Sequence, residues 1–175
     1  MSHNFFALIS RMRYIGRWGL MRNTFQENIQ EHSHMVAVLA HALAVIRRDV
    51  FGGEIDPGQA AVLALYHDAP EIRDAYREVE DVSARKLLSM LPEELRPAYT
   101  PVLIQEEDGY HALVKAADKL SAHIKCLEEL KAGNLEFRQA AQQTRQALEE
   151  SPLPEVAYFL EHFLPGFHLT LDELQ

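Results

Sequence analysis

Apolar residues recur at intervals of three and four along almost the whole chain, and this periodicity limits the possible folds more than any other feature. One stripe, between residues 29 and 48, consists of Met35, Val36, Leu39, Leu43 and Ile46. A second stripe, in a helix expected from about residue 109, contains Leu113, Ala117, Leu120, Ile124 and Leu127. No two consecutive segments alternate apolar and polar residues as strands do, and no Asn-Gly turn separates β-branched runs. The sequence therefore predicts an all-α protein.

Capping and turn residues divide this pattern into separate helices. Asn28 and Glu31 resemble a capping box and predict a helix start. Asp56 and Pro57 fit the N-cap and first helical position of the next helix, which carries AAVLALYHDAPE. Further helices are expected at about 73–90, from about 109 to Gly133, at about 135–150 and at about 154–163, with an extended tail and a helical turn after them. We therefore expect a bundle of about six or more helices.

The N-terminal segment MSHNFFALISRMRYIGRWGLMRN is too charged for a secretory signal or a membrane span, because four arginines interrupt it. Its apolar residues at helical spacing are Phe5, Leu8, Ile9 and Met12. These predict a short amphipathic helix that packs on the core rather than on a membrane. The single cysteine, Cys126, cannot form an intramolecular disulfide. We therefore expect a cytoplasmic protein that does not bind membranes.

Length and charge restrict the organisation and the partners. A chain of 175 residues without a linker or a repeat predicts one domain over residues 1–175. Its 17 basic and 26 acidic residues give a formal net charge of −9 at pH 7, so a nucleic acid polymer would be repelled. A small phosphorylated ligand is compatible with this charge, because one arginine or a metal ion can reverse the local field.

The dipeptide His67-Asp68 interrupts an apolar segment in a way that a plain helical protein does not need. A buried, ionised aspartate is unfavourable unless it is paired or binds a cation. On a helix, Glu71 would share a face with both residues, although Pro70 predicts that the helix bends or ends there. Two ligands from one turn beside a carboxylate form an arrangement that can hold a metal ion and deprotonate a water molecule.

Two other polar residues lie on apolar helices and complete a candidate ligand set. His32 lies near the start of its helix, and Asp118 interrupts the segment KAADKL. Taken singly, such a histidine more often caps a helix or lies on the surface, and such an aspartate is more often exposed. Together with His67 and Asp68 they offer two imidazoles and two carboxylates without a thiolate. This donor set suits one divalent ion of Co, Mn, Zn, Fe or Mg better than a structural zinc site.

The order His32, His67-Asp68, Asp118 resembles that of the HD-domain metal-dependent phosphohydrolase superfamily. A closer resemblance, along most of the chain, is to the family of bacterial 5′-deoxynucleotidases represented by YfbR. It is carried by the segments RWGLMRN, ENIQEHS, YHDAPE and KCLEELKAGN. The resemblance implies an HD-domain helical bundle, a homodimer, a bound divalent metal, and hydrolysis of deoxyribonucleoside 5′-monophosphates to deoxynucleoside and phosphate.

Carried over by position, the resemblance implies roles for seven residues. The metal ligands are expected to be His32, His67, Asp68 and Asp118, of which His32, Asp68 and Asp118 also contact the substrate. Glu71 is the expected water-activating carboxylate, Arg17 a catalytic and phosphate-binding residue, and Trp18 a substrate-binding residue.

The chemistry of the chain agrees with a role for Arg17. The sequence has no Gly-rich phosphate loop, so a metal ion and an arginine must hold the phosphate. A guanidinium can bind two phosphate oxygens and offset charge that develops in the transition state. Trp18 is the single tryptophan, and it has an alternative role as an anchor of the N-terminal segment to the core.

The sequence departs from the family after Glu71-Ile72. There the family continues through a loop of the form TGDLPTPVK that lines the substrate pocket, whereas here RDAYREVEDVSARKL follows at once. About fifteen residues have no counterpart, and the join between Ile72 and Arg73 carries no Gly or Pro. Either the chain lacks the loop, which affects substrate selection, or the sequence as given omits it. The absence of turn residues at the join favours omission.

Two other functions stay open. Another HD-type phosphohydrolase would act on a cyclic nucleotide, a guanosine polyphosphate or a phosphate chain with the same ligands. A non-catalytic helical dimer would bind a nucleotide or a protein, although the intact ligand set argues against it. The remaining candidates, expected to lie on the surface or in the core rather than in the site, are His34, His41, His123 and Cys126.

Overall fold

The computed structural model describes residues 3–74, 80–104, 106 and 108–174. Within these ranges the regular structure is helical, apart from an isolated bridge between Gly16 and Asn28. The helices in the N-terminal half are α1 (Phe5–Ile9), α2 (Ile29–Asp49), α3 (Pro57–Tyr66), α4 (Glu71–Asp74) and α5 (Glu80–Ser89). Those in the C-terminal half are α6 (Arg96–Leu103), α7 (Gly109–Lys131), α8 (Arg138–Glu149) and α9 (Pro154–His162). The all-α prediction is confirmed.

Short 3₁₀ helices join or extend these elements at Ser10–Tyr14, Glu93–Leu95, Leu135–Phe137, Leu164–His168 and Leu171–Leu174. The last two form the segment that was expected to be an extended tail with a helical turn. No helix in the described part of the chain is both long and apolar enough to cross a membrane.

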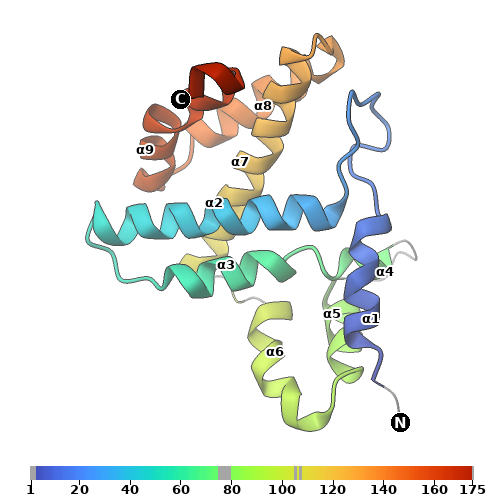
Figure 1. Cartoon of the computed structure of the whole chain (residues 1–175). Coiled ribbons are helices and arrows are strands. Elements are labelled where there is room, and N and C mark those ends of the chain that lie inside the picture. The colour runs from blue at the N-terminus through green and yellow to red at the C-terminus, as the bar shows by residue number, and fades with distance from the viewer. Residues whose placement is uncertain (1–2, 75–79, 105, 107, 175) are drawn as a thin grey trace.

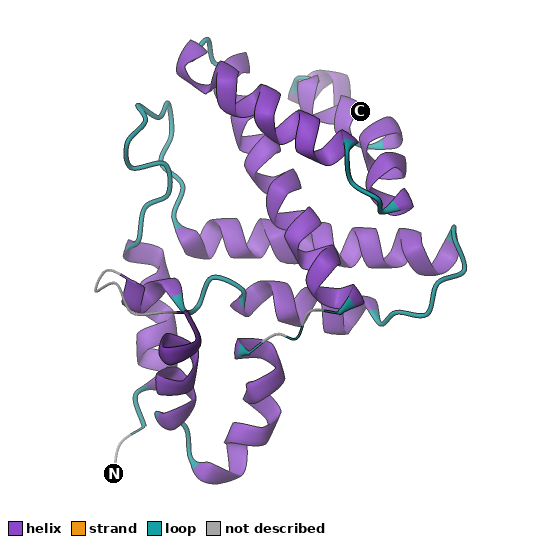
Figure 2. Cartoon of the chain, turned by 180° about the vertical axis from the view of Figure 1, so that it is seen from behind, coloured by secondary structure: helices purple, strands orange, loops and turns teal. Residues whose placement is uncertain are grey.

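The centre of the molecule is the packing of α2, α3 and α7. Helix α3 runs beside α2, and α7 crosses both, as Figures 1 and 2 show from opposite sides. Their facing side chains are fully buried and include Leu43, Leu113 and Leu120. Burying each such leucine contributes about 1.5–3 kcal/mol, so this three-helix centre forms a firm base for polar residues at its edge.

The helix starts follow from their caps as predicted. The side chain of Asn28 accepts hydrogen bonds from the backbone N–H groups of Gln30 and Glu31, and Glu31 completes a capping box. Asp56 caps α3, whose first residue is Pro57. A helix start leaves four backbone N–H groups without acceptors inside the helix. The caps supply acceptors for some of them, and so fix the first turn of α2 in place.

The structure also corrects several expectations. Of the helix expected at about 73–90, residues 73–74 lie in α4 and residues 80–89 form α5, while residues 75–79 lie outside the described ranges. Met35, placed on the buried stripe of α2, is 36% exposed. Helix α6 was not predicted, because Pro97 and Pro101 look like helix breakers. Pro97 lies at the start of α6, where a missing N–H group is tolerated.

The segment from Ile15 to Ile29 leaves the helical body and returns to it. Its ends are joined by hydrogen bonds from Arg17 N to Glu27 O (2.8 Å) and from Ile29 N to Ile15 O (3.0 Å). We call residues 15–28 the N-terminal loop. Figure 1 shows it beyond the start of α2, beside the end of α7.

Buried polar groups on α7 fasten this loop. The carboxylate of Glu129 accepts hydrogen bonds from Thr24 N (2.9 Å) and Thr24 Oγ1 (2.6 Å) and from Asn134 Nδ2 (2.8 Å). Lys125 Nζ donates to Phe25 O (2.7 Å) and to Glu129 (2.5 Å). Both Lys125 and Glu129 are at least 98% buried, so each neutralises the charge of the other.

Candidate active site

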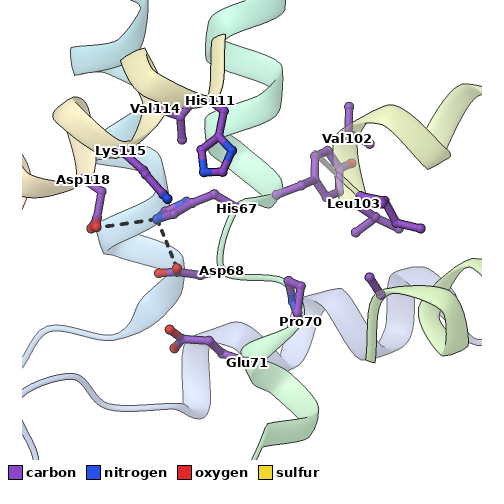
Figure 3. A pocket seen from close by; sticks show the side chains of 13 residues that line it. His67, Asp68, Pro70, Glu71, Val102, Leu103, His111, Val114, Lys115 and Asp118 are labelled. Carbon is purple, nitrogen blue, oxygen red and sulfur yellow. Dashed lines mark ion pairs between the residues drawn. The ribbon is translucent and has the colours of Figure 1, made fainter. Parts of the chain in front are cut away.

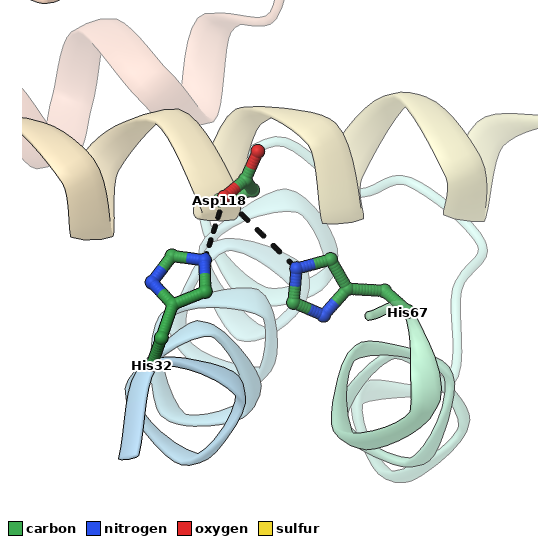
Figure 4. A group of neighbouring side chains, drawn as sticks. All are labelled: His32, His67 and Asp118. Carbon is green, nitrogen blue, oxygen red and sulfur yellow. Dashed lines mark hydrogen bonds and ion pairs between the residues drawn. The ribbon is translucent and has the colours of Figure 1, made fainter. Parts of the chain in front are cut away.

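Three side chains from three helices converge where α2, α3 and α7 meet (Figure 4). His32 lies in the first turn of α2, His67 caps the end of α3, and Asp118 lies in the middle of α7. His32 Nε2 is 2.8 Å and His67 Nε2 is 3.9 Å from Asp118 Oδ1. Their potential ligand atoms all lie within 4.8 Å of one another.

His67 has its two ring nitrogens in different environments. Nδ1 lies 2.7 Å from the carbonyl oxygen of Ala64, which can only accept, so Nδ1 carries the proton. Nε2 is then left with a lone pair that faces Asp118 and Asp68. This atom is buried and has no hydrogen-bond partner among the described residues. A buried lone pair without a donor is what a metal ligand presents before it binds an ion.

Asp68 and Arg17 border this group. Asp68 Oδ1 is 3.1 Å from His67 Nε2, and Oδ2 is 3.8 Å from His32 Nε2. Arg17 Nη1 donates to Asp68 Oδ2 at 3.3 Å. The turn 67–70 that carries Asp68 is not part of α3, which ends at Tyr66, so the helix ends before Pro70 as the sequence allowed.

A cavity of about 380 Å³ opens beside His67, Asp68 and Asp118. Glu71, the first residue of α4, is exposed and lines this cavity. In Figure 3 the carboxylates of Asp68, Glu71 and Asp118 point to the same side of the turn. The opposite wall is apolar and includes Val102 and Leu103 of α6. The cavity therefore has one charged side and one side suited to an uncharged group.

The ionisation of Asp118 favours a ligand role. Burial raises the pKa of Asp118, but the hydrogen bond from His32 and the nearby charge of Arg17 outweigh that effect, so the pKa lies below its ordinary value. Asp118 is therefore a carboxylate at neutral pH, and it can bind a cation or accept a hydrogen bond.

Trp18 lies beside the site but faces a different neighbour. Its ring packs on Phe137 with a centroid distance of 5.3 Å, and its Nε1 donates to Glu27 Oε2 at 3.0 Å. These contacts belong to a small apolar cluster around Cys126, Phe137 and Ala141. They support the anchoring role that the sequence left open for Trp18, and the half-buried ring stays a candidate substrate contact.

The other candidates from the sequence, His34, His41, His123 and Cys126, lie outside the site, as expected. His34 and His41 are exposed on α2. His123 Nδ1 lies 2.9 Å from Thr144 Oγ1 of α8, and burial, followed by the charge of Arg145, lowers its pKa. Burial raises the pKa of Cys126 to about 11, so this thiol is inert.

Sequence reasoning missed four residues around the site. Ser121 Oγ shares a hydrogen bond of 3.1 Å with His32 Nδ1 and fixes that ring from behind. Glu27 contacts both Arg17 and Trp18. His111 and Lys115 line the cavity from α7. His111 and Lys115 lie at helical spacing from Asp118, on the same face of α7. This spacing is the signal that could have identified both residues from the sequence.

The donor set fits a divalent metal. Two imidazoles and two carboxylates without sulfur, an orphaned Nε2 on His67 and an ionised Asp118 are the groups that hold Mn, Co, Fe, Zn or Mg. The second nitrogen of each histidine is occupied by Ser121 or by the Ala64 carbonyl, which fixes the ring orientation.

Comparisons with known proteins agree in family and in fold. The family model described as 5′-deoxynucleotidase YfbR-like matches residues 4–167. A 5′-deoxynucleotidase of Vibrio cholerae is 46% identical over 189 aligned residues, which cover 98% of this chain and 97% of the relative. The 5′-deoxynucleotidase YfbR of Escherichia coli K12 is 43% identical, with coverage of 98% and 95%.

The alignments also differ in length from the chain. Their 189 positions exceed the 175 residues of the chain by 14, so these relatives have residues that this chain lacks. The difference agrees in size with the loop that the resemblance places after Ile72.

Solved structures support the fold alone. An HD-domain phosphohydrolase from Listeria innocua superposes with a TM-score of 0.82 at 23% identity, covering 94% of this chain and 87% of that one. A protein from Pyrococcus horikoshii superposes with a TM-score of 0.65 at 22% identity, covering 94% and 97%.

Proposed function

The chain belongs to the 5′-deoxynucleotidase YfbR-like family, and we propose that its His-Asp site hydrolyses deoxyribonucleoside 5′-monophosphates to deoxynucleoside and orthophosphate. The observation that carries the assignment is the convergence of His32, His67 and Asp118 beside the ion pair of Asp68 and Arg17. This arrangement places ligands for a cation next to a guanidinium that can bind an anion.

His32, His67, Asp68 and Asp118 would hold one divalent ion, of Co, Mn, Zn, Fe or Mg. Such an ion supplies Lewis-acid chemistry, which polarises the phosphoryl group and activates water. His32, Asp68 and Asp118 also face the substrate phosphate in this assignment. The orphaned Nε2 of His67 and the ionised Asp118 support the ligand roles.

Glu71 and Arg17 act on the substrate directly. Glu71 takes a proton from the attacking water, whose oxygen forms a bond to phosphorus. The bond from phosphorus to the 5′-oxygen breaks, and that oxygen receives a proton as the nucleoside leaves. Arg17 offsets the negative charge on the phosphoryl oxygens. The position of Glu71 on the cavity wall and of Arg17 against Asp68 supports these roles.

The apolar wall of the cavity suits the nucleoside. Val102, Leu103 and Ile104 lie across from the charged groups, so a deoxyribose or a base can pack there while the phosphate faces Arg17. Trp18 is assigned to the substrate as well, through the part of its ring that is not covered by Phe137.

The protein is proposed to act as a homodimer of one-domain chains in the cytoplasm. One main core takes side chains from Phe5 to Leu164, which supports a single domain over residues 1–175. Apolar side chains of α1, α2 and α3 remain exposed and support a dimer contact: Phe6, Met35, Val38, Val62 and Leu65. The buried, unpaired Cys126 suits a reducing compartment.

The test is phosphate release from ribo- and deoxyribonucleoside 5′-monophosphates by protein that is stripped with EDTA and reloaded with Co, Mn, Mg, Zn or Fe(II). We expect no release from stripped protein and restored release after reloading, with the deoxy substrates preferred. Release from cyclic nucleotides or guanosine polyphosphates alone would assign another HD-type reaction. Full activity after complete metal removal would contradict the proposed site.

A further inference from the structure

Glu27 of the N-terminal loop contacts three residues of the candidate site. Its Oε2 accepts a hydrogen bond from Trp18 Nε1 at 3.0 Å and lies 3.3 Å from Arg17 Nε. Its Oε1 lies 3.9 Å from His32 Nδ1. The carboxylate is only 13% exposed, so its charge is weakly screened and acts strongly on these neighbours.

Arg17 is held between two carboxylates. Nη1 donates to Asp68, while Nε faces Glu27 at ion-pair distance without the alignment of a hydrogen bond. The hydrogen bond to Asp68 uses one of the five donors of a guanidinium. The two carboxylates therefore fix the plane of the group and leave donors for an anionic ligand.

The backbone next to Arg17 is strained. Trp18 has a φ of 58°, in the left-handed region that residues with a side chain rarely adopt. The strain is held by Trp18 O, which accepts from Met21 N (2.8 Å) and Asn23 Nδ2 (3.3 Å). The indole is fixed by Phe137 and Glu27. Such strain is maintained where the direction of a side chain matters.

We propose that Glu27 is a positioning residue that acts through Arg17. It fixes the guanidinium at the place of the substrate phosphate, and it locks Trp18 so that the strained turn keeps this orientation. The inference rests on the proposed hydrolysis, in which Arg17 binds the phosphoryl oxygens.

The first test is Glu27→Gln in the metal-loaded enzyme. The amide keeps an oxygen acceptor for Trp18 Nε1 but removes the charge that faces Arg17. We expect kcat/KM for a deoxynucleoside monophosphate to fall on the order of 10-fold, since misplacing a binding group by about 1 Å costs up to 100-fold. Glu27→Asp keeps the charge on a shorter stem and should recover part of the loss. The matched control is Glu94→Gln, which removes an exposed charge on a segment away from the site and should change little.

Coupling to Arg17 separates positioning from a general structural role. In an Arg17→Met background, Glu27→Gln should have almost no further effect on kcat/KM. An equal loss in both backgrounds, or wild-type kcat/KM in Glu27→Gln, would overturn the proposal.

A second measurement does not depend on turnover. Trp18 is the single tryptophan, so its fluorescence reports on this turn. Titration with inorganic phosphate should change the emission of the wild type, and Glu27→Gln should require several-fold more phosphate. The same phosphate affinity in both proteins contradicts the proposal. If the wild type hydrolyses none of the nucleotides, the proposed function fails, while this titration still tests Glu27.

Discussion

His67 follows the last residue of α3, and this position explains how one histidine can bond to the backbone and face a cation. As the helix ends, its ring turns back so that Nδ1 donates to Ala64 O, and Nε2 is directed at Asp118 and Asp68. In the middle of a helix that carbonyl would accept from the amide four residues on, whereas here its backbone partner is the amide of His67 itself, at 3.4 Å. The end of α3 thereby sets the tautomer, which the sequence motif alone does not specify.

Glu71 is the side chain whose chemical role is most directly testable. Glu71→Gln keeps the shape but cannot take a proton, so we expect kcat to fall by about 10²–10⁴-fold. Metal content, measured by elemental analysis, should stay unchanged, because Glu71 is outside the proposed ligand set. Glu94→Gln, an exposed change on another segment, serves as the control. Unchanged turnover in Glu71→Gln would remove this residue from the mechanism.

Helix α7 joins two tasks along its length. Asp118, in its middle, belongs to the site, and Lys125 and Glu129, near its end, hold the N-terminal loop that carries Arg17. A shift of α7 would therefore displace a proposed ligand and the phosphate-binding arginine together. The buried pair of Lys125 and Glu129 thus links the end of α7 to the position of Arg17 in the site.

Replacement of Glu129 should destabilise the protein strongly. Glu129→Gln leaves Lys125 charged and buried without its partner, so we expect a loss of about 3 kcal/mol in the free energy of unfolding. The adjacent, exposed Glu128→Gln should change it by less than about 0.5 kcal/mol. Chemical denaturation measures both, and equal stabilities of the two variants would refute the assignment.

The stability of the protein at low pH should depend on the same pair, Lys125 and Glu129. Burial raises the pKa of Glu129, but hydrogen bonds from Lys125, Thr24 and Asn134 outweigh it and lower the pKa to about 2, from an ordinary value of 4.5. The stabilisation is complete above pH 4.5 and is lost as the pH falls from there toward 2. Unfolding measured against pH should therefore show a shallower acid dependence in Glu129→Gln than in the wild type.

Helices with one apolar face could be predicted from the sequence. Features that depend on contacts between distant parts of the chain could not. Helices α2, α3 and α7 follow from apolar spacing and caps, since those signals are local. Helix α6 could not be predicted, because Pro97 is tolerated only at the start of a helix and Pro101 lies inside it, where proline normally ends a helix. Met35 was misplaced, because spacing cannot tell which edge of a stripe stays uncovered.

The same distinction holds for the site. His32, His67, Asp68 and Asp118 could be proposed because acidic and imidazole groups interrupt apolar helices. Glu27 lies in an irregular loop, where no periodicity indicates which way a side chain points. Its contacts with Arg17 and Trp18 arise only when the loop folds back on the start of α2.

As a whole, the molecule leaves apolar area uncovered on its N-terminal helices. Phe6 is 56% and Leu65 42% exposed, and both line a hollow of about 620 Å³ between α1, α2 and α3. The cavity of the candidate active site shares Tyr66 with this hollow but is otherwise lined by different residues, including those of α6 and α7. A second copy could thus cover the hollow without closing the site.

Leu65→Asp tests this contact. A charge in the hollow should favour the monomer, because the carboxylate would be buried against a second apolar surface. Light scattering after size exclusion should show a dimer for the wild type and a lower mass for the variant. Leu171→Asp, at an exposed leucine near the C-terminus, should leave the mass of the wild type unchanged. A dimeric Leu65→Asp protein would place the interface elsewhere.

The crossing of α2 and α3 by α7 also has a consequence for protein synthesis. Helices α2 and α3 are neighbours in sequence and can pair as soon as both have left the ribosome, which brings His32 and His67 together early. Asp118 and Ser121 are translated some fifty residues later, on the helix that covers both. A nascent chain therefore lacks the complete set of proposed ligands until α7 has emerged and docked, so a metal ion could be held by all four proposed ligands only after most of the chain has been made.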